Sequence, residues 1–167
     1  MLRLSSNLLF FIALAFMVAC QSQSSPADAS ASEESPVENM NAAKKVIKTD
    51  QAPNPVGPYS QAIIAGNTLY LAGQIAINPE SGDMVTDNIE NEARQVMDNL
   101  QAVLEEAGMS MDNVVKTTIY MTDLNNFGKV NEIYGSYFGE MPPARVTVGV
   151  AALPKGANLE ITMEAVR

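Results

Sequence analysis

The sequence contains no histidine, no tryptophan and a single cysteine. Without histidine, the chain lacks the commonest metal ligand and the commonest general base. One cysteine, Cys20, can form neither an internal disulfide nor a cysteine cluster for zinc. Any catalysis must therefore use carboxylates, arginine, tyrosine, hydroxyls or backbone groups, and no metal site is predicted.

Positive charge is also scarce. The chain has ten Lys and Arg residues and nineteen Asp and Glu residues, which gives a net charge of −9 at pH 7. An acidic chain repels phosphate backbones, which argues against a general nucleic-acid role. Hydrophobic residues make up 47% of the 167 residues, enough for one packed domain with tails.

The first 19 residues have the pattern of an export signal. An apolar run from Leu8 to Ala19 follows a short start with one positive charge, Arg3. The run is too short to span a bilayer, which needs about 20 residues, but it fits the apolar part of a secretory signal. Small residues directly before Cys20 resemble the bacterial lipoprotein signal, in which the cysteine is lipidated and becomes the new N-terminus. We therefore predict a lipoprotein-type signal peptide over 1–19; a plain signal peptide or an uncleaved anchor are the alternatives.

Residues 20–43 are predicted to be a lipidated cysteine followed by a flexible tether. The segment is rich in Ser, Ala, Glu, Gln and Pro and has no apolar period. Such a composition cannot bury enough surface to offset the entropy of ordering. Gln21, after the cysteine, resembles the default outer-membrane sorting signal of Gram-negative bacteria. We expect an exported, periplasmic protein that a lipid on Cys20 anchors to the outer membrane.

The folded domain is predicted to span residues 44–167. Three prolines within 52–58 remove backbone donors and fix φ, so this stretch should be a loop. Apolar runs over 61–65 and 68–72 flank Gly66-Asn67, which is typical of a β-hairpin.

Two helices are expected in this domain. Apolar residues recur at helical spacing over 89–107, with Asp87 as the N-cap. A second helix should be capped by Asp123 and carry an apolar face up to Phe138. The acidic residues of the first helix are expected on a solvated face: Glu90, Glu92, Asp98, Glu105 and Glu106.

Three further strands are predicted at 114–121, 145–151 and 159–166. The order of strands, helix, strand, helix and strands predicts an α+β domain with two helices on one face of a mixed sheet. The other face would be uncovered, and covering it gives a small domain a reason to oligomerise.

Alternation in the last two strands suggests a binding site. Arg145 alternates with valines, and Glu160 lies between Leu159 and Ile161. If the helices cover the aliphatic faces, Arg145 and Glu160 share the uncovered face, where an arginine can bind a carboxylate through two parallel hydrogen bonds. The pattern alone favours a plainer interpretation, an Arg–Glu ion pair on a solvated face, worth about 0–1 kcal/mol.

A longer resemblance changes that balance. The stretch from Pro143 to Leu153, followed by Leu159-Glu160-Ile161, resembles the signature of the RidA (YjgF-type) family of imine deaminases. Supporting matches over residues 46–167 are 57–61, 72–75, 115–118, Leu124-Asn125, Phe127 and Val130-Asn131. The resemblance implies a chorismate-mutase-like fold and a homotrimer with three sites in the clefts between subunits. It also implies hydrolysis of 2-iminobutanoate and 2-iminopropanoate to the 2-oxo acids and ammonia, without a cofactor.

The same resemblance assigns roles to residues of this chain. Arg145 matches the arginine that binds the substrate carboxylate, and Glu160 matches the acidic residue that works with the attacking water. Tyr59 and Asn131 match pocket residues, and Gly73 lies in a loop that lines the site. Pattern alone would instead make Tyr59 an aromatic that packs under a turn.

Two positions depart from the best-known members. Thr147, a predicted substrate-binding residue, stands where they have Cys, and its backbone N–H would be retained. Ala72 stands where they often have Ser, so a hydroxyl contact would be lost.

Three other functions remain open. A binding or protective envelope protein could keep the fold without relevant turnover, because known imine-producing enzymes are mostly cytoplasmic. A larger imine could be the substrate, or the chain could serve as an envelope scaffold.

Overall fold

The computed structural model describes residues 44–167. The predicted signal peptide over 1–19, the lipidation of Cys20 and the tether over 20–43 lie outside the described residues. Among the residues from 44 onward, no helix combines the length and apolar character that crossing a bilayer requires.

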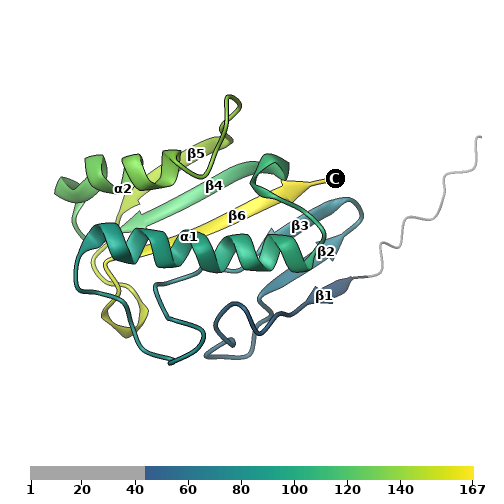
Figure 1. Cartoon of the computed structure of the whole chain (residues 1–167), viewed down its shortest axis with the longest axis horizontal. Helices are drawn as coiled ribbons and strands as arrows, with labels where there is room; N and C mark the ends of the chain where they lie inside the picture. The colour runs from purple at the N-terminus through teal and green to yellow at the C-terminus, as the bar shows by residue number, and fades with distance from the viewer. Residues whose placement is uncertain (1–43) are drawn as a thin grey trace, which may run out of the picture. The chain divides into compact units, whose positions relative to one another are not determined.

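The domain is a six-stranded mixed sheet with two α-helices (Figure 1). The strand order is β1-β2-β3-β6-β4-β5, and all neighbours are antiparallel except β4 and β5. The strands are β1 (Lys45–Ile47), β2 (Ala62–Ala65), β3 (Thr68–Leu71), β4 (Val114–Met121), β5 (Ala144–Gly149) and β6 (Leu159–Val166). The helices are α1 (Ile89–Glu106) and α2 (Phe127–Gly135), with short 3-10 turns η1 (Met111–Asn113), η2 (Leu124–Asn126) and η3 (Pro154–Gly156).

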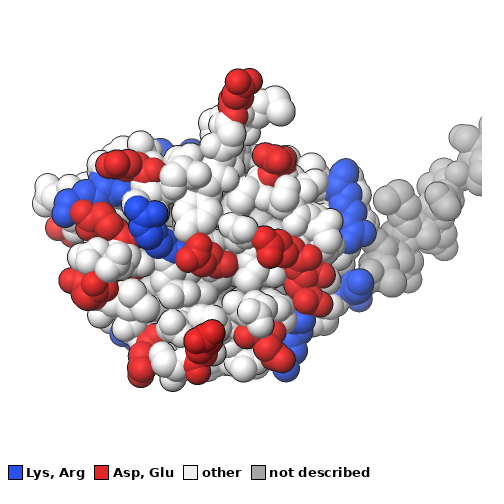
Figure 2. Space-filling view, in the orientation of Figure 1, with Lys and Arg blue, Asp and Glu red and all other residues white. Residues whose placement is uncertain are grey.

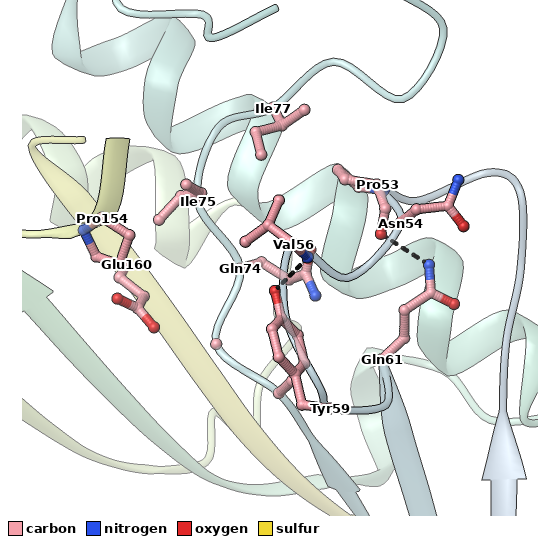
Figure 3. Close-up of a pocket in the computed structure, with 12 residues that line it drawn as sticks. Pro53, Asn54, Val56, Tyr59, Gln61, Gln74, Ile75, Ile77, Pro154 and Glu160 are labelled. Atoms are coloured by element: carbon pink, nitrogen blue, oxygen red, sulfur yellow. Dashed lines mark hydrogen bonds between the residues drawn. The ribbon is translucent and has the colours of Figure 1, made fainter. Parts of the chain in front are cut away.

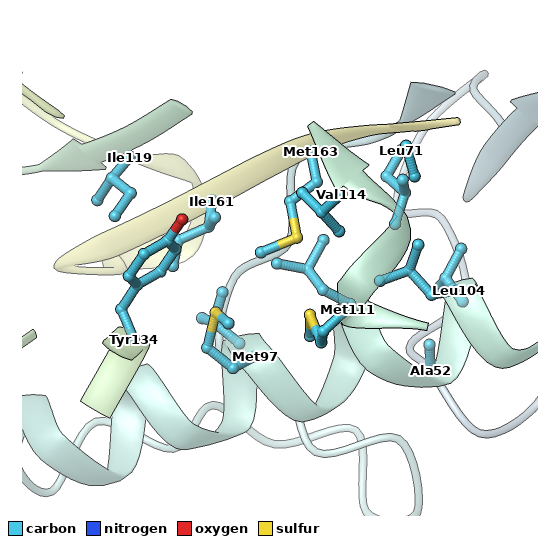
Figure 4. Packing of buried hydrophobic residues seen from close by; sticks show 14 of the residues in the cluster. Ala52, Leu71, Met97, Leu104, Met111, Val114, Ile119, Tyr134, Ile161 and Met163 are labelled. Carbon is cyan, nitrogen blue, oxygen red and sulfur yellow. The ribbon is translucent and has the colours of Figure 1, made fainter. Parts of the chain in front are cut away.

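Both helices cover the same face of the sheet, as the sequence predicts (Figure 1). The core fills the space between α1 and the central strands (Figure 4). Met97 and Leu100 of α1 have no exposed surface, and neither has Met121 of β4 or Leu159 of β6. Burying each such side chain stabilises the fold by about 1.5–3 kcal/mol relative to exposure. The predicted α+β architecture is confirmed.

The predicted hairpin is also confirmed. Ala65 pairs with Thr68, so only Gly66 and Asn67 form the turn between β2 and β3. Gly66 has φ +63°, a conformation that residues with a β-carbon rarely adopt. Strand β1, which pairs with β2 at the sheet edge, was not predicted, because three residues carry too short a pattern to recognise.

Three predictions about the helices are corrected. Asn88, not Asp87, is the N-cap of α1, since its Oδ1 accepts the Asn91 N–H at 2.8 Å. Asp123 caps η2 instead of a long helix, and α2 ends at Gly135, before Phe138. The third prediction, that Glu92 lies on a solvated face, is also wrong.

Glu92 is fully buried, although it was predicted on a solvated face with four other acidic residues. Figure 2 shows acidic side chains scattered over the helix-covered face of the domain. Glu90 belongs to this surface and forms an ion pair with Lys129 at 3.0 Å, and that hydrogen bond lowers the pKa of Glu90. Helical periodicity predicted the apolar stripe of α1 but could not show that a carboxylate lies within it.

The strand register separates Arg145 from Glu160, contrary to prediction. Directly paired residues project on the same side of a sheet. Arg145 pairs with Thr117, which is buried under the helices, so Arg145 projects on the helix side. Glu160 pairs with Tyr120, which also pairs with the exposed Val148 on the uncovered side. The prediction failed because alternation tells which side of a strand is apolar, but not which side the helices cover.

Candidate functional site

An arginine lies on an aromatic surface at the sheet edge. Arg145, on β5, donates from Nη2 to Asn131 Oδ1 of α2 at 2.9 Å. Its guanidinium carbon is 4.8 Å from the ring centre of Tyr134 and 5.6 Å from that of Phe127. Cation–π attraction and the hydrogen bond orient the guanidinium while its side chain stays exposed. Across residues 44–167 the one ion pair is Lys129–Glu90, so the Arg–Glu surface pair is not formed.

The aromatic surface beneath Arg145 is itself fixed. The Tyr134 hydroxyl donates to Thr117 Oγ1 at 3.1 Å. Burial raises the pKa of Tyr134, and the Thr117 hydrogen bond and the positive charge of Arg145 oppose that rise. Tyr134 therefore stays a neutral, protonated ring at ordinary pH, which suits it to lie against a cation.

Thr147 lies two residues beyond Arg145 on the same side of β5. Its Oγ1 is buried and has no hydrogen-bond partner in the described part of the chain. Leaving a buried hydroxyl unpaired costs about 1–3 kcal/mol. Next along this side, a β-carbon on Gly149 would come 3.2 Å from Leu124 Cδ1, so the Leu124 side chain lies close to the strand backbone there. Residues Asn131, Arg145 and Thr147, together with Phe127 and Tyr134, are named the arginine half-site.

A cavity of about 320 Å³ lies elsewhere on the chain (Figure 3). Its walls are mainly apolar, with contributions from Val56, Ile75, Ile77 and Pro154. Tyr59, Gly73 and Glu160, three of the residues singled out from the sequence, also line it. We name this the glutamate half-site.

The proline-rich loop of the glutamate half-site is held by one side chain. Gln61 is 1% exposed, and its Nε2 donates to the carbonyls of Thr49, Ala52 and Pro53 at 3.0, 3.1 and 2.9 Å. Its Oε1 accepts the Thr49 N–H at 2.8 Å. The predicted loop is therefore present and ordered by Gln61.

Tyr59 does not pack under a turn, because 48% of its surface is exposed. Its hydroxyl accepts the Val56 N–H at 3.2 Å, a contact drawn in Figure 3. The ring thus forms an accessible wall of the cavity with a fixed orientation.

Glu160 lies at the edge of the same cavity, across Gly73. A β-carbon on residue 73 would overlap the Glu160 carboxylate, so a glycine is required for this approach. The Gln74 N–H donates to Ile161 O at 2.9 Å, and the Ile161 N–H donates to Gln74 O at 3.1 Å, which holds the Gly73 loop against β6. Burial raises the pKa of the Glu160 carboxyl. No group of three potential metal ligands occurs among residues 44–167.

One chain does not bring the two half-sites together. Arg145 of β5 pairs with Thr117 of β4, and Thr117 pairs with Met163 of β6. Met163 is three residues from Glu160 along β6. Two strand spacings of about 4.8 Å and three residues of about 3.4 Å separate the two Cα atoms by roughly 14 Å. Because the side chains also point to opposite sides of the sheet, a molecule of a few atoms cannot contact both within one chain.

Sequence reasoning missed the aromatic pair that supports Arg145. Phe127, Asn131 and Tyr134 are spaced i, i+4 and i+7, so they share one side of α2. That spacing was the available signal, but only the parallel pairing of β5 with β4 shows which strand they face.

A family model described as Endoribonuclease L-PSP matches residues 49–167. A RutC family protein of Pyrococcus horikoshii is 53% identical over 118 residues, which cover 71% of this chain and 94% of that protein. The mouse protein named 2-iminobutanoate/2-iminopropanoate deaminase is 47% identical over 124 residues, which cover 74% of this chain and 92% of the mouse protein.

The fold is also found in solved structures. The crystal structure of Escherichia coli TdcF with bound serine superposes with a TM-score of 0.71. It is 38% identical and covers 74% of this chain and 98% of the TdcF chain. The Escherichia coli structure thus carries an amino acid on the same fold.

Proposed function

Because the chain belongs to the Endoribonuclease L-PSP (RidA) family, we propose that it is an imine deaminase. Its substrates would be small 2-imino acids, 2-iminobutanoate and 2-iminopropanoate, which it hydrolyses to 2-oxo acids and ammonia. The observation that carries the proposal is Arg145, whose guanidinium is oriented by Asn131 and Tyr134 yet pairs with no carboxylate of the described chain. Such a group is suited to bind the carboxylate of an imino acid.

Two relatives support the substrate class. The mouse relative carries the name of this deaminase at 47% identity. The TdcF structure contains serine, which shares the carboxylate and the adjacent C–N unit of a 2-imino acid. The family's name suggests RNA cleavage, but a net charge of −9 repels the RNA phosphates, and the chain has no histidine to act as a general base.

A complete site needs more than one copy of the chain, and a homotrimer is part of the proposal. Arg145 and Glu160 lie too far apart in one chain, so each site would combine the arginine half-site of one subunit with the glutamate half-site of another. Val146 and Val148 on the uncovered side of the sheet are 45% and 40% exposed, and Tyr70 is 49% exposed. Apolar surface of this kind is stabilised when a second subunit covers it.

The proposed mechanism uses two charged side chains. Arg145 binds the substrate carboxylate and holds the imine carbon in place, which removes much of the entropic cost of reaction. Glu160 of the partner subunit accepts a proton from water as the water oxygen attacks that carbon. The protonated carboxyl then returns the proton to nitrogen, which gives a carbinolamine. Glu160 next takes the proton of the new hydroxyl and passes it to nitrogen as the C–N bond breaks, so ammonia leaves and the 2-oxo acid remains. A raised pKa suits Glu160 to this exchange, because a partly desolvated carboxyl gains and loses a proton closer to neutral pH.

The test is imine hydrolysis by the purified protein, with 2-iminobutanoate generated in situ by an amino-acid oxidase. Arg145→Ala should lose about 2–5 kcal/mol of substrate and transition-state binding. Arg94→Ala, which removes another exposed arginine from α1, is the matched control and should behave as wild type. If wild type and Arg145→Ala remove the imine at the same rate, the deaminase proposal fails and a non-catalytic binding or protective role is favoured.

The cellular location is proposed from the sequence alone. We propose that the chain is exported and anchored to the outer membrane through a lipid on Cys20. Cell fractionation should place the wild type with the outer membrane and Cys20→Ser in a soluble fraction. Equal distribution of both proteins would reject the anchor.

A further inference from the structure

Helix α1 carries two buried polar side chains in its apolar stripe. Glu92 is 0% exposed and Asn99 is 1% exposed. They are seven residues apart, which places both on the sheet-facing side, about 10.5 Å apart along the helix. Burying polar groups is unfavourable unless each is hydrogen-bonded, so their partners indicate what they do.

Glu92 binds the backbone directly before Glu160. Its Oε1 accepts the N–H of Asn158 at 2.7 Å and that of Leu159 at 3.2 Å. Its Oε2 accepts from Asn158 Nδ2 at 3.0 Å. The backbone on the other side of Glu160 is held by the pair of hydrogen bonds between Ile161 and Gln74. Glu160, the second residue of β6, thus lies between two fixed neighbours.

Asn99 binds a second segment that lines the same cavity. Its Nδ2 donates to the carbonyl of Ile75 at 3.2 Å and to that of Ile77 at 3.0 Å. Its Oδ1 accepts from Gln95 Nε2 at 2.9 Å. Both isoleucines line the cavity, and their segment continues from Gly73, on which the Glu160 carboxylate lies.

We propose that Glu92 and Asn99 are positioning residues for catalysis, which set the Glu160 carboxylate and the cavity wall at Ile75 and Ile77 from the buried side of the sheet. The proposal rests on the deaminase function proposed above. Neither residue touches the cavity, so their effect passes through the backbone of β6 and of the Gly73 segment. Fixed backbone on both sides limits the positions that the Glu160 carboxylate can adopt.

The test compares three variants of the purified protein in the imine assay. Glu92→Ala removes all three hydrogen bonds, and because displacing a catalytic group by about 1 Å can cost about 100-fold, kcat should fall by about 10- to 100-fold. KM should change by less than about 3-fold, since Arg145 still binds the carboxylate. Glu92→Gln keeps an acceptor for the two backbone N–H groups and should restore kcat to within about 3-fold of wild type.

Tyr137→Phe is the control for a purely structural effect. It removes a 2.6 Å hydrogen bond from the Tyr137 hydroxyl to Asp98, a residue of helix α1 that does not line the cavity. This variant should lose stability but keep its kcat. If Glu92→Ala does not assemble, Glu92→Asp, which retracts the carboxylate by one methylene, is assayed in its place and should also lower kcat.

Two outcomes overturn different claims. An active wild type with an unchanged kcat in Glu92→Ala, or in Glu92→Asp where Ala does not assemble, would reject the positioning role and leave the deaminase intact. An inactive wild type would reject the deaminase and with it this inference.

Discussion

The Glu160 carboxylate lies directly over the backbone of Gly73. A β-carbon added at residue 73 would overlap Glu160 Oε1 and come 3.0 Å from Glu160 Cδ. The atoms that it would meet belong to the end of a side chain and not to the backbone. The glycine is therefore needed for the position of the carboxylate more than for the fold.

Gly73→Ala tests this relationship. The Glu160 side chain can turn away from the new methyl group, so the melting temperature should stay close to that of wild type. The carboxylate would leave its place, and a displacement of about 1 Å can cost about 100-fold in rate. Steady-state imine hydrolysis and thermal unfolding measure both effects. Loss of stability with an unchanged kcat would show that Gly73 serves the fold.

Thr147→Val tests the unpaired hydroxyl beside Arg145. Removing a buried hydroxyl without a partner should raise the free energy of unfolding by about 1 kcal/mol or more, as measured by denaturant titration. If the hydroxyl is reserved for the substrate, KM should rise by about 10-fold, the worth of one hydrogen bond to a charged group. Thr147→Ser keeps the hydroxyl and should keep KM near the wild-type value. A less stable Thr147→Val with an unaltered KM would contradict this role.

Glu160→Gln should change stability in a pH-dependent way. Burial raises the pKa of Glu160 above its ordinary value of 4.5 in the folded protein. Below that value both states hold the proton, and the group adds no pH dependence. As pH rises, the unfolded state loses the proton first, so the wild type loses stability that Glu160→Gln keeps.

The measurement is the difference in unfolding free energy between Glu160→Gln and wild type, from about pH 4 to about pH 8. The difference should grow in favour of the variant as pH rises, while its deaminase activity is lost. A difference that shrinks over this range would mean that the folded protein stabilises the charged carboxylate.

Much of the fold follows from local pattern. Strands β4 and β6 occur with the predicted bounds, because β4 is rich in β-branched and aromatic residues and β6 alternates apolar with polar residues. The Gly66-Asn67 turn and the apolar stripe of α1 are equally local signals. Such elements are set by residues close together in the sequence.

The side of the sheet on which Arg145 lies depends on pairing between distant strands. Only the parallel register of β5 with β4 shows that Arg145 faces Tyr134 and that Val146 faces away from the helices. The burial of Glu92 depends similarly on the distant Asn158 and Leu159. Sequence resemblance identified the candidate residues, but the division of the site into two half-sites required the three-dimensional arrangement.

Complementation between two inactive variants tests most directly whether each site combines Arg145 of one subunit with Glu160 of another. Arg145→Ala and Glu160→Gln, each inactive alone, are co-expressed with different tags, and mixed assemblies are purified through both tags. Every mixed trimer has one interface at which both groups are intact, so the doubly purified assemblies should recover about one third of the wild-type activity. Mixed assemblies as inactive as their parents would contradict a shared site.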